Sequence, residues 1–277
     1  VPSIEAARRL MVERLLRFGC PSGRAQELAQ GWTLHADFIL FPWKQQFDYV
    51  VGNPPYVRLE YLPKLLLREY RSRYRTTTDR ADLYVAFLES GLTLLKKEGV
   101  LAFICANRFA KNHYGTSLRK LISERFHVRY YINLEHTQPF LQDVSAYPAI
   151  VVIDHQQDQP TRACSVASLA PPVLEQIRRQ ALSSSRLDSL LSTFSSWYPL
   201  GAPWVTTDAG EYAFLSHLKD RFPLLEDSAT ETHVGIGVAT GADHVFILGQ
   251  KNEMIEEDRQ IPLLMASDIH SDQLEWS

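Results

Sequence analysis

The chain has 277 residues, of which 45% are hydrophobic, and a formal net charge of -3 at neutral pH. This composition excludes an intrinsically disordered polymer, and the near-neutral charge gives no overall basic signal for a nucleic-acid partner. The apolar stretches are too short to cross a bilayer, so no membrane partner is expected. The 3 cysteines lack the spacing of a disulfide framework or a zinc site, which predicts a cytoplasmic protein without a metal.

Helical and strand-like patterns alternate along the first part of the chain. Apolar residues recur with helical spacing in some segments, and short apolar runs typical of buried strands separate them. The last two predicted strands follow one another without a helix, which indicates an antiparallel pair closing a mostly parallel sheet. The predicted helices cover residues 4–18, 24–30, 82–97 and 116–125, and the predicted strands cover residues 32–37, 47–51, 100–105, 128–134 and 149–153.

Composition divides the chain into three parts. Residues 156–203 are rich in Gln, Pro and Ser, which is typical of a connector between domains. We therefore expect a first domain over residues 1–155, a boundary near residue 200, and a further domain over residues 204–277.

The segment Asn53-Pro54-Pro55-Tyr56 directly follows the predicted strand over residues 47–51. In open α/β sheets, ligands bind beyond the carboxyl ends of the strands. An Asn side-chain oxygen and the carbonyl of the next Pro can accept the two hydrogens of an exocyclic amine, which localises the nitrogen lone pair for attack. Two consecutive prolines fix the backbone that presents this carbonyl. The pattern fits the binding of a planar amine, and it also fits a simple tight turn.

Tyr56 adds an aromatic face to this segment. A base that leaves a duplex loses a few kcal/mol of stacking and pairing, and stacking on an aromatic side chain returns about 1–3 kcal/mol. We therefore expect Asn53, Pro54 and Tyr56 to be catalytic residues, and Pro55 and Tyr56 to hold the base.

Four blocks of sequence follow one another in an order known from one group of enzymes. They are Ala36-Asp37-Phe38, then residues 47–56, then residues 82–89, which begin Asp-Leu-Tyr, and then residues 99–107, which begin Gly-Val-Leu. With this order the chain resembles the gamma-class adenine-N6 DNA methyltransferases. The branch in question includes type IIG restriction-modification enzymes and the methyltransferases of BREX phage defence.

The resemblance implies a fold, a cofactor and a set of site residues. The fold is α/β, with a Rossmann-like class I methyltransferase sheet, and the cofactor is S-adenosyl-L-methionine. Asp37, Phe38 and Asn53 would contact this cofactor, with Asp37 hydrogen-bonded to its adenine. Phe140, ahead of residues 144–146, would supply a second face to an adenine flipped out of double-stranded DNA. A nuclease domain or other restriction or defence subunits would lie outside this segment.

The resemblance is incomplete at both ends of the chain. The family's glycine-rich cofactor loop has no match ahead of Asn53. With the family's strand order 3-2-1-4-5-7-6, the sheet is expected to be partial, with N-terminal strands missing. Residues 235–243 and 261–269 resemble the opening of the family's target-recognition domain, so residues 204–277 are expected to be the truncated start of such a domain.

A basic segment follows the aromatic residue of the motif. Arg71, Arg73 and Arg75 lie among tyrosines in a stretch with few acids. Arginines placed in this way can contact phosphates beside a flipped base. A solvated basic helix face explains the same pattern equally well.

Two alternative functions stay open. Families that methylate RNA guanine or the glutamine amide of a protein also use Asn-Pro-Pro-Tyr, but the resemblance of residues 235–243 to a DNA-recognition domain argues against them. A catalytically inactive module that only binds DNA is the other alternative, because the glycine-rich loop has no match in the sequence.

Overall fold

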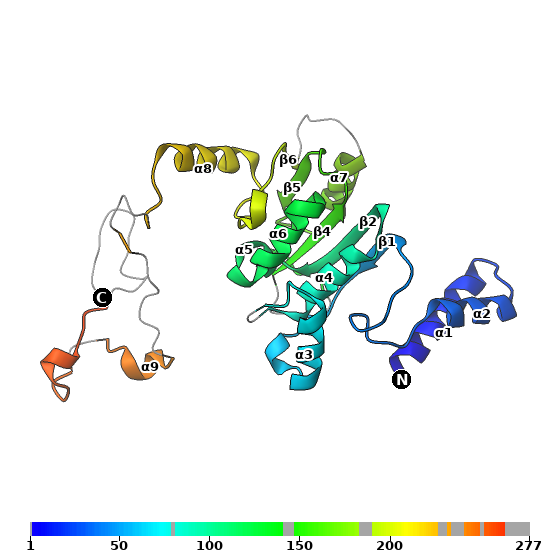
Figure 1. Ribbon diagram of the computed structural model, residues 1–277, viewed down its shortest axis with the longest axis horizontal. Helices are drawn as coiled ribbons and strands as arrows, with labels where there is room; N and C mark the ends of the chain where they lie inside the picture. Colours follow the sequence, from blue (N-terminus) through cyan, green and yellow to red (C-terminus); the bar gives the residue numbers. More distant parts are fainter. Residues whose placement is uncertain are drawn as a thin grey trace. The chain divides into compact units, whose positions relative to one another are not determined.

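The structure is a computed structural model that describes residues 2–78, 81–140, 147–182, 190–226, 232–233, 241–249 and 252–263. The chain divides into two compact units, Val1–Ser216 and His217–Ser277. Helices pack on a sheet of six described strands in the first unit, so the prediction of an α/β fold is confirmed (Figure 1). The described part of the second unit includes α9 (Asp243–Phe246) and a 3-10 turn (Glu257–Arg259). Among the described helices, none combines the length and apolarity that a bilayer crossing requires.

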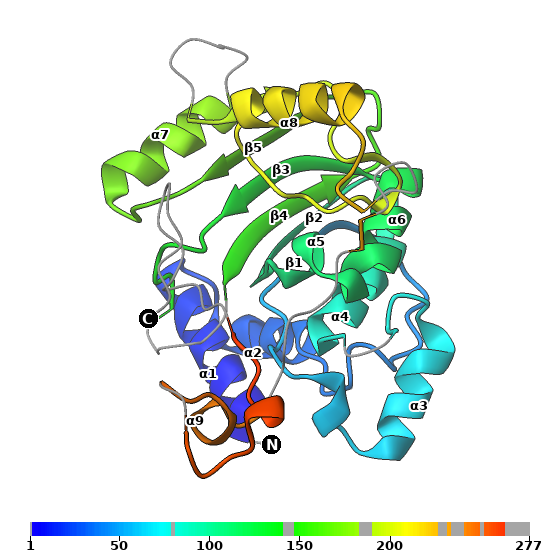
Figure 2. The ribbon, with the colours of Figure 1, turned by 90° about the vertical axis from the view of Figure 1, so that its left-hand side faces the viewer.

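The sheet has the strand order β1-β2-β4-β3-β5-β6, and Figure 2 shows the run from β1 to β5. β1 is parallel to β2, β4 runs antiparallel between β2 and β3, and β3 is parallel to β5. The run β1-β2-β4-β3 therefore reproduces the 4-5-7-6 part of the expected order. The strands are β1 (Phe47–Gly52), β2 (Leu95–Ala106), β3 (His127–Asn133), β4 (Pro148–Asp154), β5 (Thr161–Ser165) and β6 (Ser192–Phe194).

Helices cover both faces of the sheet. α4 and α6 contribute to the larger buried apolar cluster, and α7 contributes to a second cluster. In β4, Val151 and Ile153 belong to the first cluster and Ile150 packs against the second, because successive side chains of a strand point to opposite faces. The helices are α1 (Pro2–Arg17), α2 (Ser22–Trp32), α3 (Lys64–Arg73), α4 (Leu83–Thr93), α5 (Arg108–Lys111), α6 (Thr116–Arg125), α7 (Pro171–Leu182) and α8 (Ala209–Arg221).

α4 lies unusually close to β2. A side chain at Gly91 would place its Cβ 2.7 Å from Cδ1 of Leu101, so any larger residue would force the buried Leu101 side chain to move. Leu88, Leu92 and Leu101 are fully buried at the contact, and burial of each leucine side chain stabilises the fold by about 1.5–3 kcal/mol. This packing holds the start of α4 near the carboxyl ends of β1 and β2.

The prediction of a strand over residues 32–37 is wrong. α2 extends into this segment, and in the described chain residues 33–37 join no strand. The Asp37 carboxylate accepts hydrogen bonds from the backbone N–H groups of Ile39 at 2.9 Å and Leu40 at 3.1 Å. Short acidic side chains that bond nearby backbone groups favour turns over strand pairing. The segment therefore ends in a turn.

The predicted helix over residues 82–97 ends early, at Thr93. β2 begins at Leu95, and its register against β1 shifts before Val100. A Cβ at Gly99 would lie 2.8 Å from the carbonyl oxygen of Phe47, so this irregularity needs a glycine. The two lysines before Gly99 suit an exposed helix end as well as an exposed bulge, which is why the sequence pattern misplaced the boundary.

The expectation of a mostly parallel sheet is also wrong. Three of the five pairings between the described strands are antiparallel. The antiparallel pairing of β3 with β4 is confirmed, but β4 inserts between β2 and β3 and so makes an antiparallel contact on each side. The antiparallel β5–β6 pair adds the third.

The interpretation of residues 156–203 as a connector is wrong for their described parts. β5 and β6 extend the sheet beyond β3, and α7 buries Ile177 against it. The division between the two compact units falls after Ser216, not near residue 200. Composition misleads here because the buried residues are few and widely spaced, whereas the polar residues lie on exposed positions.

Candidate active site

The loop after β1 presents the Asn-Pro-Pro-Tyr segment at the carboxyl end of the strand, as the sequence predicts. Asn53 follows Gly52, the last residue of β1, and its side chain is exposed. Pro54 is buried, which fixes the position of the carbonyl that it presents. The loop is also held from the other side, because the backbone N–H of Leu83 donates to the carbonyl of Val57 at 2.7 Å.

Tyr56 contacts two aromatic rings that are distant from it in sequence. The centroid of its ring is 6.0 Å from that of Phe140, with an interplanar angle of 65°, and 6.4 Å from that of Tyr84. Burial raises the pKa of the half-buried Tyr56 phenol, which therefore stays neutral. Its hydroxyl lies 3.5 Å from the carbonyl oxygen of Ile104. The structure thus brings Tyr56 and Phe140 together, as the resemblance implied, and adds Tyr84.

Asp37 is fixed in place by three hydrogen bonds although its side chain is exposed. Besides the two bonds to Oδ1 from Ile39 and Leu40, Oδ2 accepts a bond of 2.5 Å from the hydroxyl of Tyr70. Burial and this bond both raise the pKa of Tyr70. The carboxylate is therefore held at a set orientation by the turn and by α3.

Phe38 stacks on Phe87 of α4, with ring centroids 5.1 Å apart and an interplanar angle of 11°. Trp43 also packs against the Phe38 ring, with ring centroids 5.6 Å apart, and its indole N–H donates to the Phe38 carbonyl at 3.0 Å. The sequence pattern assigns Phe87 to the apolar side of a helix and not to a site. Its half-buried position next to Phe38 places it beside the residues implied to hold the cofactor.

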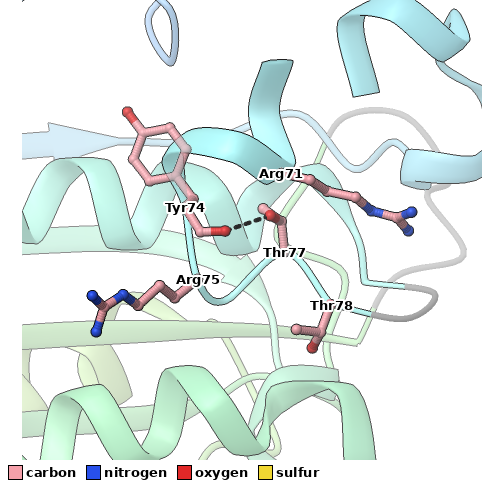
Figure 3. A pocket seen from close by; sticks show the side chains of 5 residues that line it. All are labelled: Arg71, Tyr74, Arg75, Thr77 and Thr78. Carbon is pink, nitrogen blue, oxygen red and sulfur yellow. Dashed lines mark hydrogen bonds between the residues drawn. The ribbon is translucent and has the colours of Figure 1, made fainter. Parts of the chain in front are cut away.

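Arg71 and Arg75 line an open pocket of about 490 Å³ together with Tyr74, Thr77 and Thr78. Figure 3 shows the two arginine side chains extending in opposite directions, with the threonines between them. The Thr77 hydroxyl donates to the Tyr74 carbonyl at 2.7 Å and so shapes the loop (Figure 3). The pocket has no carboxylate among its lining residues.

Arg73 is oriented differently from Arg71 and Arg75. Its guanidinium donates to the carbonyl of Leu40 at 2.7 Å and so ties α3 to the Asp37 turn. The three arginines that the sequence grouped therefore do not form one cluster around the pocket. Spacing could not distinguish them, because neighbouring residues at the end of a helix point in different directions.

Glu89 anchors the loop that carries the pocket. Its buried carboxylate accepts bonds from the Thr76 N–H at 2.9 Å, the Thr76 hydroxyl at 2.6 Å and the Arg75 N–H at 3.3 Å. Sequence reasoning missed Glu89 as a functional candidate. An acid on the buried face of a predicted helix was the available signal, since buried acids need partners.

A polar cluster lies beyond the carboxyl ends of β2 and β3. The buried Asn107 amide donates to Asn133 at 3.2 Å and to Glu135 at 3.0 Å, and Lys111 also donates to Glu135 at 3.0 Å. Burial opposes the ionisation of Glu135, but the bonds from Lys111 and Asn133 outweigh it and lower its pKa. The cluster fixes the start of the segment that leads to Phe140.

Some sequence-based expectations concern residues outside the described ranges. They are residues 144–146, residues 235–240 of the segment 235–243, and residues 264–269 of the segment 261–269. In the described part of the chain, no group of three His, Cys, Asp or Glu side chains gathers as metal ligands would.

The candidate site lies within a segment that matches a known protein family. Residues 19–140 match the Eco57I restriction-modification methylase family. This segment runs from α2 through the Asp37 turn and the loop after β1 to Phe140. It therefore contains every residue discussed above as part of the candidate site.

Relatives of known name match over almost the whole chain. The Type II methyltransferase M.PaeR7I of Pseudomonas aeruginosa is 42% identical over 96% of this chain and 46% of its own length. The Type II methyltransferase M.XhoI of Xanthomonas vasicola is 38% identical over 99% of this chain and 51% of its own length. The chain thus spans about half the length of the curated relatives that it matches.

Among solved structures, the methyltransferase subunit of a type I restriction-modification system from Streptococcus thermophilus aligns with 62% of this chain and 42% of its own, with a TM-score of 0.48 and 17% identity.

Proposed function

We propose that this protein transfers a methyl group from S-adenosyl-L-methionine to the N6 amine of an adenine flipped out of double-stranded DNA, as part of a restriction-modification or phage-defence system. The observation that supports this most is the Asn53–Tyr56 loop at the carboxyl end of β1, with Phe140 beside Tyr56. The match of residues 19–140 to a restriction-modification methylase family supports the same activity.

The side chain of Asn53 and the carbonyl of Pro54 accept the two amine hydrogens of the target base. Both acceptors lie at one strand end, and the second is fixed by a buried proline. Acceptance of both hydrogens orients the nitrogen lone pair. Pro55 and Tyr56 line one side of the base, and Phe140 offers a second aromatic face. Since the phenol of Tyr56 stays neutral, its ring serves for stacking and not as a base.

The residues around Asp37 fit the adenosine part of the cofactor. A carboxylate has about four acceptor positions, and Asp37 uses three of them for Ile39, Leu40 and Tyr70. The remaining position on Oδ2 suits an exocyclic amine, and the ring of Phe38 suits the face of a purine. Asn53 would contact the cofactor from the strand end. When bound, S-adenosyl-L-methionine supplies the electrophilic methyl group.

Arg71 and Arg75 contact DNA phosphates in this proposal. Their pocket offers two cations and the Thr78 hydroxyl, a combination that suits a phosphate oxygen. Arg73 uses one donor on Leu40 and contributes through its remaining N–H groups.

The test uses the full-length protein, unmethylated bacterial DNA and S-adenosylmethionine with a labelled methyl group. We expect N6-methyladenine in the digested DNA. Replacement N53A should lower the rate by about 10²–10³-fold, the usual effect of removing one preorganised polar contact, with a much smaller effect on cofactor binding, for which Asp37 and Phe38 remain. The matched control is Q159A, which removes an exposed amide from the loop after β4. Label found in RNA or in protein glutamine, or N53A with wild-type turnover, would reject the proposal.

A further inference from the structure

Asp82 occupies the N-cap position of α4 but does not act as a cap. Among the described residues, its carboxylate accepts no hydrogen bond from the first N–H groups of the helix. It instead accepts a bond of 3.1 Å from the hydroxyl of Tyr114. An aspartate normally stabilises a helix from this position by capping, so the observed bond replaces a favourable local contact with a distant one.

The bond to Asp82 is the last of a chain of hydrogen bonds through two tyrosines. The Tyr84 and Tyr114 hydroxyls lie 3.0 Å apart, and the backbone N–H of Phe109 donates to the Tyr84 hydroxyl at 3.0 Å. The single proton of Tyr114 points to Asp82, since an ionised carboxylate only accepts. Tyr84 must therefore donate to Tyr114, and each proton has one assigned direction. We call these groups the tyrosine chain.

The tyrosine chain connects three parts of the candidate site. One end is the turn after β2, through Phe109. The other end is Asp82, which pairs with Arg58 in an antiparallel bridge to the loop after β1. In the middle, the ring of Tyr84 contacts the ring of Tyr56. The relative positions of the loop after β1, the start of α4 and the turn after β2 thus depend on the same bonds.

Packing alone does not require these hydroxyls. Tyr84 is fully buried, and Tyr114 is half-buried against the same apolar cluster. Phenylalanine at both positions would fill nearly the same volume without burying polar atoms, which is costly unless every bond is made. A second bond fixes Phe109 from the opposite side, where its carbonyl accepts from the buried Arg119 at 2.5 Å. The two hydroxyls therefore serve to fix the positions of Asp82 and Phe109 relative to α4.

We infer that Tyr84 and Tyr114 are positioning residues for methyl transfer. Their hydroxyls hold Tyr56 and the turn after β2 at the spacing that a flipped adenine needs. Neither hydroxyl touches the base or the methyl donor. The inference rests on the proposed function, because it assigns these residues to the same site.

The test compares Y84F and Y114F in the full-length protein with the control Y130F. Tyr130 donates a hydrogen bond of 2.6 Å to the Ala181 carbonyl on the side of the sheet covered by α7, so its replacement also removes one partly buried bond. At saturating DNA and cofactor, we expect kcat to fall roughly 10-fold to 100-fold in Y84F and less in Y114F, a range typical of small misplacements. The Kd of the cofactor should stay unchanged, and Y130F should keep the wild-type kcat.

A second readout separates positioning from general loosening. After the methylated adenine has been mapped, a duplex with 2-aminopurine at that position reports the environment of the flipped base by its fluorescence. We expect Y84F and Y114F to change this signal and Y130F to leave it unaltered. Wild-type kcat and fluorescence in both variants, or losses that follow Tm equally in all three, would overturn the inference. A wild-type protein that makes no N6-methyladenine would instead overturn the proposed function.

Discussion

The loop after β1 and the loop after α3 are held in different ways. The first is paired by backbone bonds to residues 81–83 and is connected through the tyrosine chain to the turn after β2. The second, over residues 75–78, has local bonds of its own, and the long-range hydrogen bonds described for it all go to the carboxylate of Glu89. Several independent contacts fix a position closely, whereas one anchor leaves a loop able to adjust. The first arrangement suits reacting atoms, and the second suits contact with a flexible phosphate backbone.

Replacement of Glu89, whose carboxylate anchors the loop after α3, should have the largest effect on stability. Replacement E89L leaves the buried N–H and hydroxyl of Thr76 without their acceptor, and each such buried group costs about 1–3 kcal/mol. We expect the free energy of unfolding in urea to fall by about 3 kcal/mol, with weaker DNA binding.

The control for E89L is E98L, which makes the same chemical change at an exposed position of β2 and should alter stability by less than about 0.5 kcal/mol. If kcat at saturating DNA falls in E89L as far as in N53A, the two loops are not held separately and the comparison fails.

One backbone bond of the loop after β1 can be removed selectively. Leu83 is the first residue of α4, a position that tolerates proline, and Asp82 before it has the extended conformation that proline requires. Replacement L83P removes the bond to the Val57 carbonyl. Relative to L83A, which loses the side chain but keeps the N–H group, we expect a further loss of about 1 kcal/mol in the free energy of unfolding.

The same pair of variants tests what the bond does for activity. We expect L83P to have a lower kcat than L83A, since the loop that carries Asn53 loses a fixed point. Equal kcat values in the two variants would show that this backbone bond does not position the loop.

The smallest effect on stability is expected at the pocket itself. Arg71 and Arg75 are exposed, so R71A/R75A should change the free energy of unfolding by less than about 0.5 kcal/mol. The dependence of log DNA affinity on log salt should become shallower by about 0.9 for each phosphate that the variant no longer neutralises. The control R178A/R179A changes the net charge equally on α7. An unchanged slope in R71A/R75A would reject the phosphate-binding role of these arginines.

The parts of the fold that follow local rules could be predicted from the sequence. β1 is an apolar run that ends at two prolines, so both the strand and the position of Asn53 could be read directly. The placement of Phe140 at the site was expected from the family resemblance, because no residue spacing in the sequence connects Phe140 with Tyr56. The sequence pattern wrongly predicted a strand that ends at Asp37, because the hydrogen bonds from the Ile39 and Leu40 N–H groups to the Asp37 carboxylate favour a turn over strand pairing.

The residues that hold the site together were not predictable in this way. Three of them lie on α4, namely Tyr84, Phe87 and Glu89. The spacing of apolar residues along this helix marks the two aromatic residues as core and Glu89 as a polar interruption of the core. Their roles depend on partners such as Tyr114, Thr76 and Phe38, which only the folded chain brings near. β6 was missed for a similar reason, since three residues form a strand only beside β5.

The one-way order of donors in the tyrosine chain has an evolutionary consequence. Each hydroxyl needs the next group as its acceptor, so the loss of Asp82 would leave a buried proton on Tyr114 without a partner, and the loss of Tyr84 would leave the Phe109 N–H group unpaired. A joint replacement by apolar residues would still leave the Phe109 N–H group unpaired, so Tyr84 is needed in every case, and its own proton needs Tyr114 and Asp82. Among related sequences, we expect Tyr114 and Asp82 to be kept wherever Tyr84 is kept.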